Sequence, residues 1–227
     1  MKKEIFQEIC SQVFSSLENN EQLTIYLEGE NSQYFRFNDS KLRQSGIIED
    51  YAVTISLFSG KKSLQAATTV SSDIESSVTN LKNEIHALRN PLSLIPENEL
   101  TIFPDRFESV EMIKSGQLPD RNEILEALMD VITRDYLTGV WTSGKIFRAC
   151  STSEGTNHWF EKDSFIFDFS LIDEKENMVK VLFPGSSWDK NKFNAAFEEA
   201  SSKLKLMNNP KMELKPGKYR VWFEPNA

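Results

Sequence analysis

Two kinds of periodicity alternate along the chain, and they constrain its fold more than any other feature. Residues 3–18 carry hydrophobic side chains at helical spacing, whereas residues 51–58 and 163–172 alternate in the manner of half-buried strands. Short polar turns, such as the one around Gly60, separate the strands. Turns of this length join antiparallel strands, because parallel strands need long crossover connections. The pattern therefore predicts an α+β fold with mostly antiparallel strands.

The same order of elements occurs twice, which predicts two tandem units of helix, about four strands and helix. We expect the first unit over residues 1–90 and the second over residues 120–208. Helix N-caps are expected at Ser72 or Asp73, at Asp120 and at Asp189. Four prolines mark residues 91–119 as an irregular connection, with a short helix near 109–114. Residues 209–227 predict a turn and a strand that lead to a C-terminal domain absent from this sequence.

Small polar residues predict two further turns inside the strand-rich stretches. Residues 30–32 should separate a strand at 23–28 from a strand at 34–37. Ser143-Gly144 should separate residues 137–141 from residues 145–149 in the same way. The expected number of about four strands in each unit depends on these turns.

Charge and cysteine usage exclude several function classes. The 34 acidic and 26 basic residues give a net charge of −8, which argues against a nucleic-acid partner because phosphate contacts need a surplus of Lys and Arg. No run of about 20 apolar residues is present, so no membrane partner is expected. The first residues lack the apolar core of a signal peptide. Cys10 and Cys150 are too few for a disulfide framework, and a reducing cytoplasm is the expected location.

No catalytic or metal motif is present, and we assign no catalytic residue and no metal ligand. His86 and His158 are the only histidines, and neither has a second donor at the spacing of a metal site. Cys150 and His158 flank a strand end and could approach each other. An unrecognised hydrolase built on this pair therefore stays open as a lesser alternative.

Four residues are candidates for substrate or partner contact. Arg36 and Arg148 follow phenylalanines at equivalent places on the second strand of each expected unit. Each arginine could bind a peptide carboxylate, or it could brace its sheet by pairing with an acid such as Asp39 or Glu49 in the first unit. His158 and Trp159 lie in segment 152–161, whose composition suits either a binding loop or a cover for the sheet edge.

Three segments carry a family resemblance. The first runs from Phe35 to Gly46 and is followed by the hairpin at 51–69, the second repeats this layout from Lys145 to Phe183, and the third is the Pro-Gly-x-Tyr strand at 216–219. Together they resemble the TldD/PmbA family, also described as modulator-of-DNA-gyrase or peptide-maturation proteins. In that family the third strand leads into a C-terminal domain, where the metalloprotease members carry an HExxxH helix. This sequence contains no HExxxH.

The resemblance implies the function of a framework rather than of an enzyme. The expected role is the N-terminal scaffold of a TldD/PmbA-like protein, which forms substrate access and a dimerisation framework for maturation or degradation of peptides. Its implied partners are peptides or unfolded protein segments, and a homo- or hetero-oligomer with a family member. This chain would hold no cofactor, and a metal such as zinc would belong to the absent C-terminal domain. The resemblance implies that a full-length parent would be a metalloprotease or its inactive partner subunit. The rival is a free-standing protein-binding module without an enzymatic partner.

Overall fold

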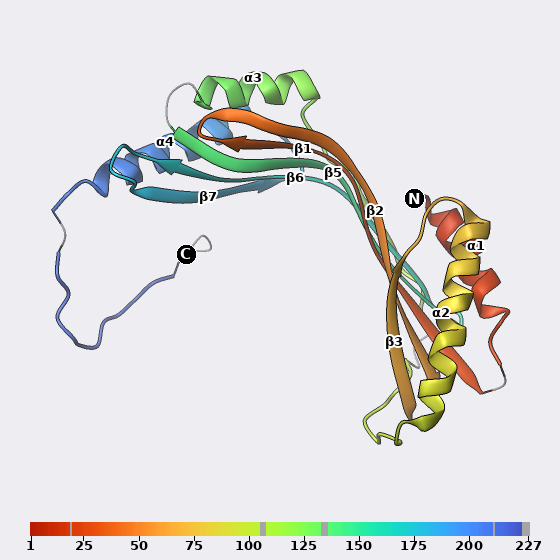
Figure 1. The fold of residues 1–227 in the computed structure, drawn as a ribbon. Helices are drawn as coiled ribbons and strands as arrows, with labels where there is room; N and C mark the ends of the chain where they lie inside the picture. The colour runs from red at the N-terminus through yellow and green to blue at the C-terminus, as the bar shows by residue number, and fades with distance from the viewer. Residues whose placement is uncertain (19, 105–107, 133–135, 211, 224–227) are drawn as a thin grey trace. The chain divides into compact units, whose positions relative to one another are not determined.

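The computed structural model describes residues 1–18, 20–104, 108–132, 136–210 and 212–223. This part of the chain forms an α+β fold, as expected, with one seven-stranded sheet in the order β3-β2-β1-β5-β6-β4 and with β7 also paired to β6 (Figure 1). The helices are α1 Lys3–Phe14, α2 Ile74–Leu94, α3 Arg121–Ile132 and α4 Lys190–Leu206. The strands are β1 Glu21–Asn38, β2 Lys41–Ser59, β3 Lys62–Thr69, β4 Glu111–Lys114, β5 Tyr136–Thr152, β6 Asn157–Ile172 and β7 Met178–Gly185.

Two compact units are present, but they do not follow each other along the chain as the sequence suggested. Unit 1 contains residues 1–31, 48–115 and 145–162, and unit 2 contains residues 32–47, 116–144 and 163–227. Strands β1, β2, β5 and β6 each contribute residues to both units. The expected boundaries at 90 and 120 therefore differ from those of the structure, because each unit uses strand segments that are distant in sequence.

The two predicted turns inside the strands are wrong. Strand β1 continues through residues 30–32, and β5 continues through Ser143-Gly144. A two-residue hairpin turn needs positive φ at one or both central residues, and in the described chain neither Ser143 nor Gly144 has it. The hairpin between β1 and β2 turns instead at Asp39 and Ser40, where φ is 52° at both residues. The predicted turn at Gly60 is confirmed, with φ of 58°.

The three predicted helix caps are confirmed. Asp73 accepts a hydrogen bond from the Ser76 backbone N–H at 3.2 Å. Asp120 accepts two such bonds at 2.8 Å, and Asp189 accepts bonds from the second and third residues of α4. The carboxylates satisfy N–H groups that have no partner inside the helix. Helix α2 runs through Pro91 to Leu94, past the expected end of the first unit.

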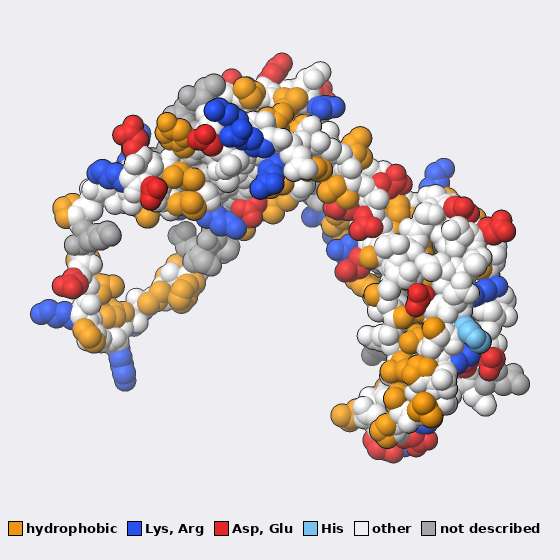
Figure 2. All heavy atoms as spheres, in the orientation of Figure 1, with side chains coloured by type: hydrophobic (Ala, Val, Ile, Leu, Met, Phe, Trp, Pro, Cys, Tyr) orange, Lys and Arg blue, Asp and Glu red, His pale blue; other side chains and the backbone are white. Residues whose placement is uncertain are grey.

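Two further expectations at the borders of the units are corrected. The short helix expected near 109–114 is strand β4, which pairs in parallel with residues 159–162 of β6. Residues 212–223 form neither a helix nor the expected strand. Their hydrophobic side chains are exposed, Trp222 at 87%, because no sheet neighbour covers them (Figure 2). Glu224 to Ala227 lie outside the described residues.

Each unit has its own hydrophobic core on one face of its strands. In unit 1, α1 and α2 cover buried residues such as Leu23, Ile25 and Leu27 of β1. In unit 2, α3 and α4 cover a core rich in phenylalanine, including Phe167 and Phe169 of β6. The side chains that alternate with these residues lie on the opposite face of the strands, which carries no helix of the described chain (Figure 1). None of the described helices has the length and apolar character needed to cross a membrane.

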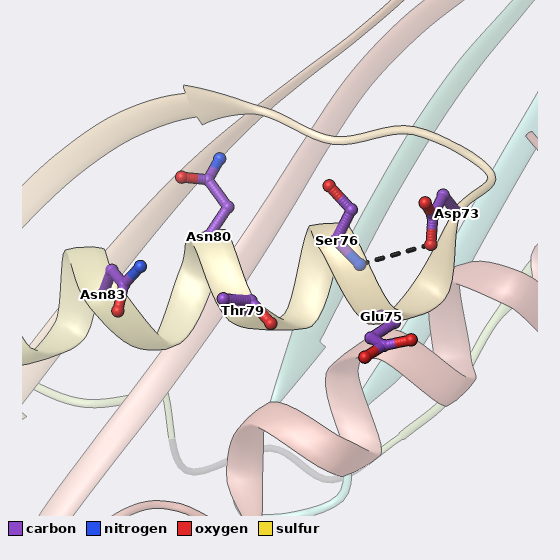
Figure 3. A pocket seen from close by; sticks show the side chains of 6 residues that line it. All are labelled: Asp73, Glu75, Ser76, Thr79, Asn80 and Asn83. Atoms are coloured by element: carbon purple, nitrogen blue, oxygen red, sulfur yellow. Dashed lines mark hydrogen bonds between the residues drawn. The ribbon is translucent and has the colours of Figure 1, made fainter.

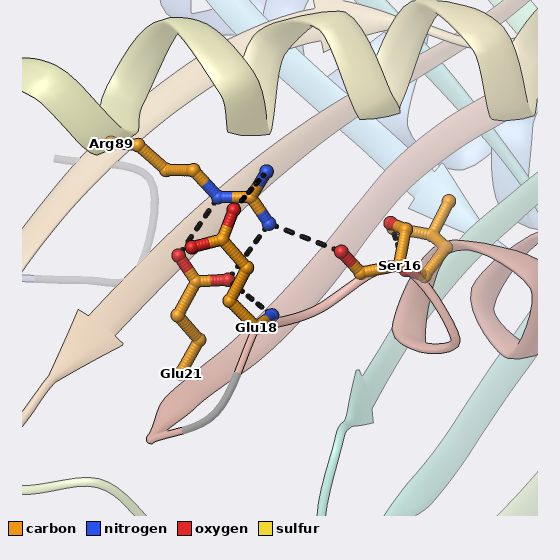
Figure 4. A network of polar contacts seen from close by, with 5 residues as sticks. Ser16, Glu18, Glu21 and Arg89 are labelled. Carbon is orange, nitrogen blue, oxygen red and sulfur yellow. Dashed lines mark hydrogen bonds and ion pairs between the residues drawn. The ribbon is translucent and has the colours of Figure 1, made fainter.

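Arg89 joins α2 to the first residue of β1 and to the segment before it (Figure 4). Its Nε and Nη2 donate to the two carboxylate oxygens of Glu21, each at 2.9 Å, and Nη2 also donates to the Ser16 carbonyl at 3.1 Å. Nη1 lies 3.2 Å from a carboxylate oxygen of Glu18. The bidentate bond to Arg89 lowers the pKa of Glu21. This network joins three parts of unit 1 that hydrophobic periodicity does not connect.

Candidate functional site

Arg148 lies on the open face of unit 1, at the edge of a depression of about 220 Å³. Its neighbours in β5, Phe147 and Ala149, are buried in the core, so strand alternation directs Arg148 to the opposite face. Its Nε lies 3.3 Å from a carboxylate oxygen of Glu28, and its Nη1 donates to the Phe147 carbonyl at 2.7 Å. Of the two roles that the sequence left open for Arg148, the structure shows the contact expected for bracing the sheet, an ion pair with Glu28.

The depression beside Arg148 is acidic overall. Its lining contains three carboxylates and a single guanidinium, with small or apolar side chains between them: Glu28, Gly29, Glu30, Asp50, Ala52, Ile146 and Arg148. Because Glu28 already neutralises much of the charge of Arg148, the remaining field favours a cationic group over a carboxylate.

Gly29 lets β1 pass close to the ring of Tyr51. A Cβ atom at position 29 would lie 2.6 Å from Cδ1 of Tyr51, closer than any normal contact. Burial raises the pKa of Tyr51 to about 12, with a further rise from the nearby Glu49 carboxylate. The Tyr51 hydroxyl therefore stays protonated and donates to Glu49 at 3.2 Å. Behind the depression, Gly29 packs against the Tyr51 ring, whose protonated hydroxyl is not a reactive group.

Arg36 belongs to unit 2 and does not share the surroundings of Arg148. It is exposed on β1, and it makes no hydrogen bond or ion pair with another described residue. Neither Asp39 nor Glu49 pairs with it. The neighbouring Phe35 is buried and lies under the guanidinium of Arg121, at 5.8 Å from its ring centre. The matching sequence positions of the two arginines thus do not give matching contacts.

His158 and Trp159 stand on opposite faces of β6, and only one of them is accessible. The His158 side chain is exposed, and its Nδ1 accepts a hydrogen bond from the Val110 backbone N–H at 3.2 Å. Trp159 is only 3% exposed and packs against Phe6 and Phe147, with ring centres 6.2 Å and 5.8 Å away. Residues 157–172 form a strand that turns the Trp159 ring into the core, so of the two candidate residues only His158 is exposed.

The cysteines lack the properties of a catalytic nucleophile. Burial raises the pKa of the Cys150 thiol, and it raises that of Cys10 to about 12. An activated thiol needs a lowered pKa and an oriented base. The Nδ1 atom of His158 is already engaged by the Val110 N–H. A Cys150–His158 catalytic pair therefore has no support in the geometry.

The zinc that the family resemblance implies does not fit the described part of this chain. No three His, Cys, Asp or Glu side chains gather there in a way that could hold a metal ion. His86 is exposed on α2, and His158 lies on β6. We derive no step through a metal from these residues.

A second depression, which no sequence pattern predicted, lies between α1 and the turn that joins β5 to β6. It has a volume of about 410 Å³, and its lining is mostly small and polar: Gln7, Cys10, Ser11, Phe14, Ser151, Thr152, Ser153, Gly155 and Asn157. Ser151 Oγ donates to Asn157 Oδ1 at 2.6 Å, and Thr152 Oγ1 accepts from the Thr156 N–H at 3.1 Å. Both bonds lie within the turn between β5 and β6 and hold its two sides together.

A third depression, of about 550 Å³, lies along the outer side of α2 in unit 1 (Figure 3). It is lined by Asp73, Glu75, Ser76, Thr79, Asn80 and Asn83. Asn80 also reaches the end of β3, where its Nδ2 donates to Thr68 Oγ1 at 2.8 Å and to the Thr69 carbonyl at 3.2 Å. The lining has two carboxylates and no cation. Sequence reasoning recognised Asp73 as a cap but could not place this surface beside the edge of the sheet.

Comparison with solved structures identifies the fold. Two neighbours are described as candidate modulators of DNA gyrase. The one from Bacteroides thetaiotaomicron has a TM-score of 0.66 and 12% identity over 96% of this chain and 52% of its own. The one from Thermotoga maritima has a TM-score of 0.58 and 10% identity, with coverages of 87% and 48%. TldE from Thermococcus kodakarensis has a TM-score of 0.57 and 11% identity, with coverages of 88% and 47%.

The sequence itself has no such counterpart. No protein-family model matches it, and no curated protein resembles it significantly. The chain spans about half the length of the structures that it matches. The resemblance to TldD/PmbA proteins is therefore confirmed at the level of the fold: the chain has the fold of about half of a TldE or gyrase-modulator-type protein.

Proposed function

We propose that this chain is a non-catalytic framework in a TldD/TldE-type peptide-processing assembly. It holds peptides or unfolded protein segments for a metal-bearing domain or subunit that performs the cleavage. The observation that carries the proposal is the fold likeness over 96% of the chain, at a TM-score of 0.66, to about half of a larger protein. The open, acidic sheet face around Arg148 and Glu28 supports the peptide-holding part of the role.

The protonated cysteines support a non-catalytic role. Burial raises the pKa of both thiols, so neither is a ready nucleophile near pH 7. The acidic balance of the chain, −8, agrees with a preference for basic or neutral segments over nucleic acid.

Association with a metal-bearing TldD-type subunit from the same genome tests the proposal. Light scattering after size-exclusion chromatography should show a complex in the mixture that is larger than either protein alone. The complex should cleave an unstructured peptide, and this chain alone should not. Chelation of the metal should abolish the cleavage and leave the complex intact.

Two outcomes would contradict the framework role. Cleavage by this chain alone, with the metal-bearing subunit omitted, would make it an enzyme in its own right. Peptide binding without any association with the metal-bearing subunit would favour the rival, a free-standing protein-binding module. Glu28→Lys serves as a variant of the sheet face: it should weaken binding of a basic peptide without preventing assembly, because the depression would lose one of its carboxylates.

A further inference from the structure

Strand β3 ends the sheet order, so one of its sides has no neighbouring strand in the described chain. It pairs with β2 in antiparallel register, from Ser59↔Lys62 at the turn to Ala52↔Thr69, without a bulge. In a hairpin with a two-residue turn, the residue pair next to the turn is hydrogen-bonded, and non-hydrogen-bonded and hydrogen-bonded pairs then alternate along the two strands. Here the first pair is Ser59↔Lys62. The bond from the Val70 N–H to the Tyr51 carbonyl, at 3.0 Å, follows this alternation.

The alternation identifies which backbone groups of β3 point away from β2. They belong to Ser63, Gln65, Ala67 and Thr69, since these residues occupy the non-hydrogen-bonded positions. Asn80 covers the Thr69 carbonyl. The outward N–H and C=O groups of Ser63, Gln65 and Ala67 have no backbone partner among the described residues. Such a row of alternating donors and acceptors is complementary to one more extended backbone.

Beyond its first residue, Lys62, the sequence of β3 carries little that protects this edge. Residues 63–69 contain no charged side chain and no proline, the devices that usually prevent strand addition at an edge. Other edge segments do carry them: β7 contains Lys180 and Pro184, and β4 has four residues, two of them charged. A stretch of seven residues, 63–69, without a charge or a proline is therefore particular to β3 among these edge strands.

The surface next to the edge selects the charge of the incoming segment. The depression on α2 includes Asn80, which contacts Thr68 and Thr69 of β3. It also includes the carboxylate of Asp73, whereas Glu75 points to the other side of the helix from Asn80 (Figure 3). No Lys or Arg lies in its lining. A basic side chain is favoured there, whereas a second copy of this chain would bring the same carboxylates and a net charge of −8.

We propose that the outer side of β3 binds an extended, basic polypeptide segment by strand addition. The segment donates and accepts backbone hydrogen bonds at Ser63, Gln65 and Ala67, and a Lys or Arg side chain at its end beside Thr69 reaches the Asp73 carboxylate. The inference rests on the proposed peptide-holding function and adds the edge of β3 to the sheet face around Arg148 as a surface that contacts the peptide. Sequence selectivity is low, because main-chain bonds supply most of the affinity.

Fluorescence anisotropy with the full chain tests the proposal. The probe is a labelled peptide of alternating Lys and Thr with the length of β3, 8 residues. A peptide with Glu in place of Lys should bind at least about tenfold more weakly, because of the acidic lining. A peptide with its internal amides N-methylated should not bind measurably, because it cannot donate the strand-pairing bonds.

Ala67→Pro is the diagnostic variant of the protein. It removes an outward N–H that the ladder with β2 does not use, so proline is tolerated there as on other edge strands. Affinity for the Lys-Thr peptide should fall about tenfold. Ala67→Ser keeps the N–H and should bind as the original chain does. Gln65→Lys adds to the edge a charge of the same sign as the peptide, without changing the backbone, and it too should weaken binding. It is the variant to use if Ala67→Pro fails to fold.

Three results would overturn the proposal. One is unchanged affinity in both Ala67→Pro and Gln65→Lys with melting curves of a folded protein. The second is equal binding of the N-methylated peptide. The third is that the original chain binds no peptide but forms a dimer, which Ala67→Pro converts to a monomer. This result would assign the edge to self-association. None of these concerns assembly with a metal-bearing subunit, so that test can succeed while this one fails.

Discussion

At the scale of single residues, Glu21 and Arg89 carry the clearest electrostatic contribution to stability. The Glu21 side chain is 9% exposed and Arg89 is 24% exposed, so solvent screens their bidentate bond only in part. Arg89 lowers the pKa of Glu21 from its ordinary 4.5. The contribution is thus fully present above about pH 4.5 and is lost as the pH falls through the lowered value.

Glu21→Gln should lower the free energy of unfolding at pH 7 by about 1–2 kcal/mol. The loss should shrink as the pH falls from 4.5 through the lowered pKa of Glu21, since the carboxylate that bonds Arg89 is then protonated. Urea unfolding at several pH values measures both effects. Glu18→Gln is the matched control: it faces the same arginine but is 68% exposed, and it should change stability by less than about 0.5 kcal/mol. Equal losses from the two variants would contradict the assignment.

The two cysteines differ in exposure, and their labelling should follow that difference. Cys10 is 1% exposed, and the pKa of its thiol is raised to about 12. Cys150 is intermediate in burial, and burial raises the pKa of its thiol. In the folded chain at pH 8, Ellman's reagent should label Cys150 more slowly than a free thiol and leave Cys10 unlabelled. Denaturant should expose both. Fast labelling of Cys150 would revive the hydrolase alternative, and Cys150→Ser would then be the variant to assay.

At the scale of elements, short-range signals were predictable and long-range pairing was not. Asp73, Asp120 and Asp189 cap helices because an aspartate acts on N–H groups only two or three residues away. The turn at Gly60 is equally local. The continuity of β5 through Ser143-Gly144 depends instead on neighbouring strands that supply hydrogen bonds on both sides, which no local pattern encodes. Arg148 was found from the sequence, but its partner Glu28 follows from the placement of β1 beside β5.

The contribution of one such local contact, the Asp189 cap of α4, can be measured. Asp189 Oδ1 accepts bonds from the Asn191 and Lys192 N–H groups at 2.9 Å and 3.2 Å. Asp189→Ala should cost about 1 kcal/mol in a chemical denaturation experiment, because those N–H groups lose their acceptor. Asp189→Asn keeps an acceptor oxygen and should cost only a few tenths of that. A loss as large for Asn as for Ala would mean that the charge, not the cap, matters.

At the scale of the whole molecule, the interleaving of the two units decides what can fold alone. Unit 1 takes Phe147, Ala149 and Trp159 into its core from residues 145–162, far from its other segments. Trp159 lies against Phe6 of α1, and the Ser153 N–H donates to the Leu23 carbonyl at 2.9 Å. The sequence boundary near residue 119 would sever these contacts, since periodicity shows where elements are but not which of them share a core.

A fragment of residues 1–119 should therefore lack cooperative structure, although it contains α1, α2 and the first four strands. Without β5 and β6, the side of β1 that pairs with β5 is unpaired and the aromatic cover of Phe6 is missing. A fragment of residues 1–162 restores every segment of unit 1 and serves as the matched control. Thermal melting and amide proton dispersion should distinguish them: the longer fragment should show a cooperative transition and the shorter one should not. A cooperative melt of residues 1–119 would show that the first half folds without the strands that return to it, and that the boundary suggested by the sequence is a physical one.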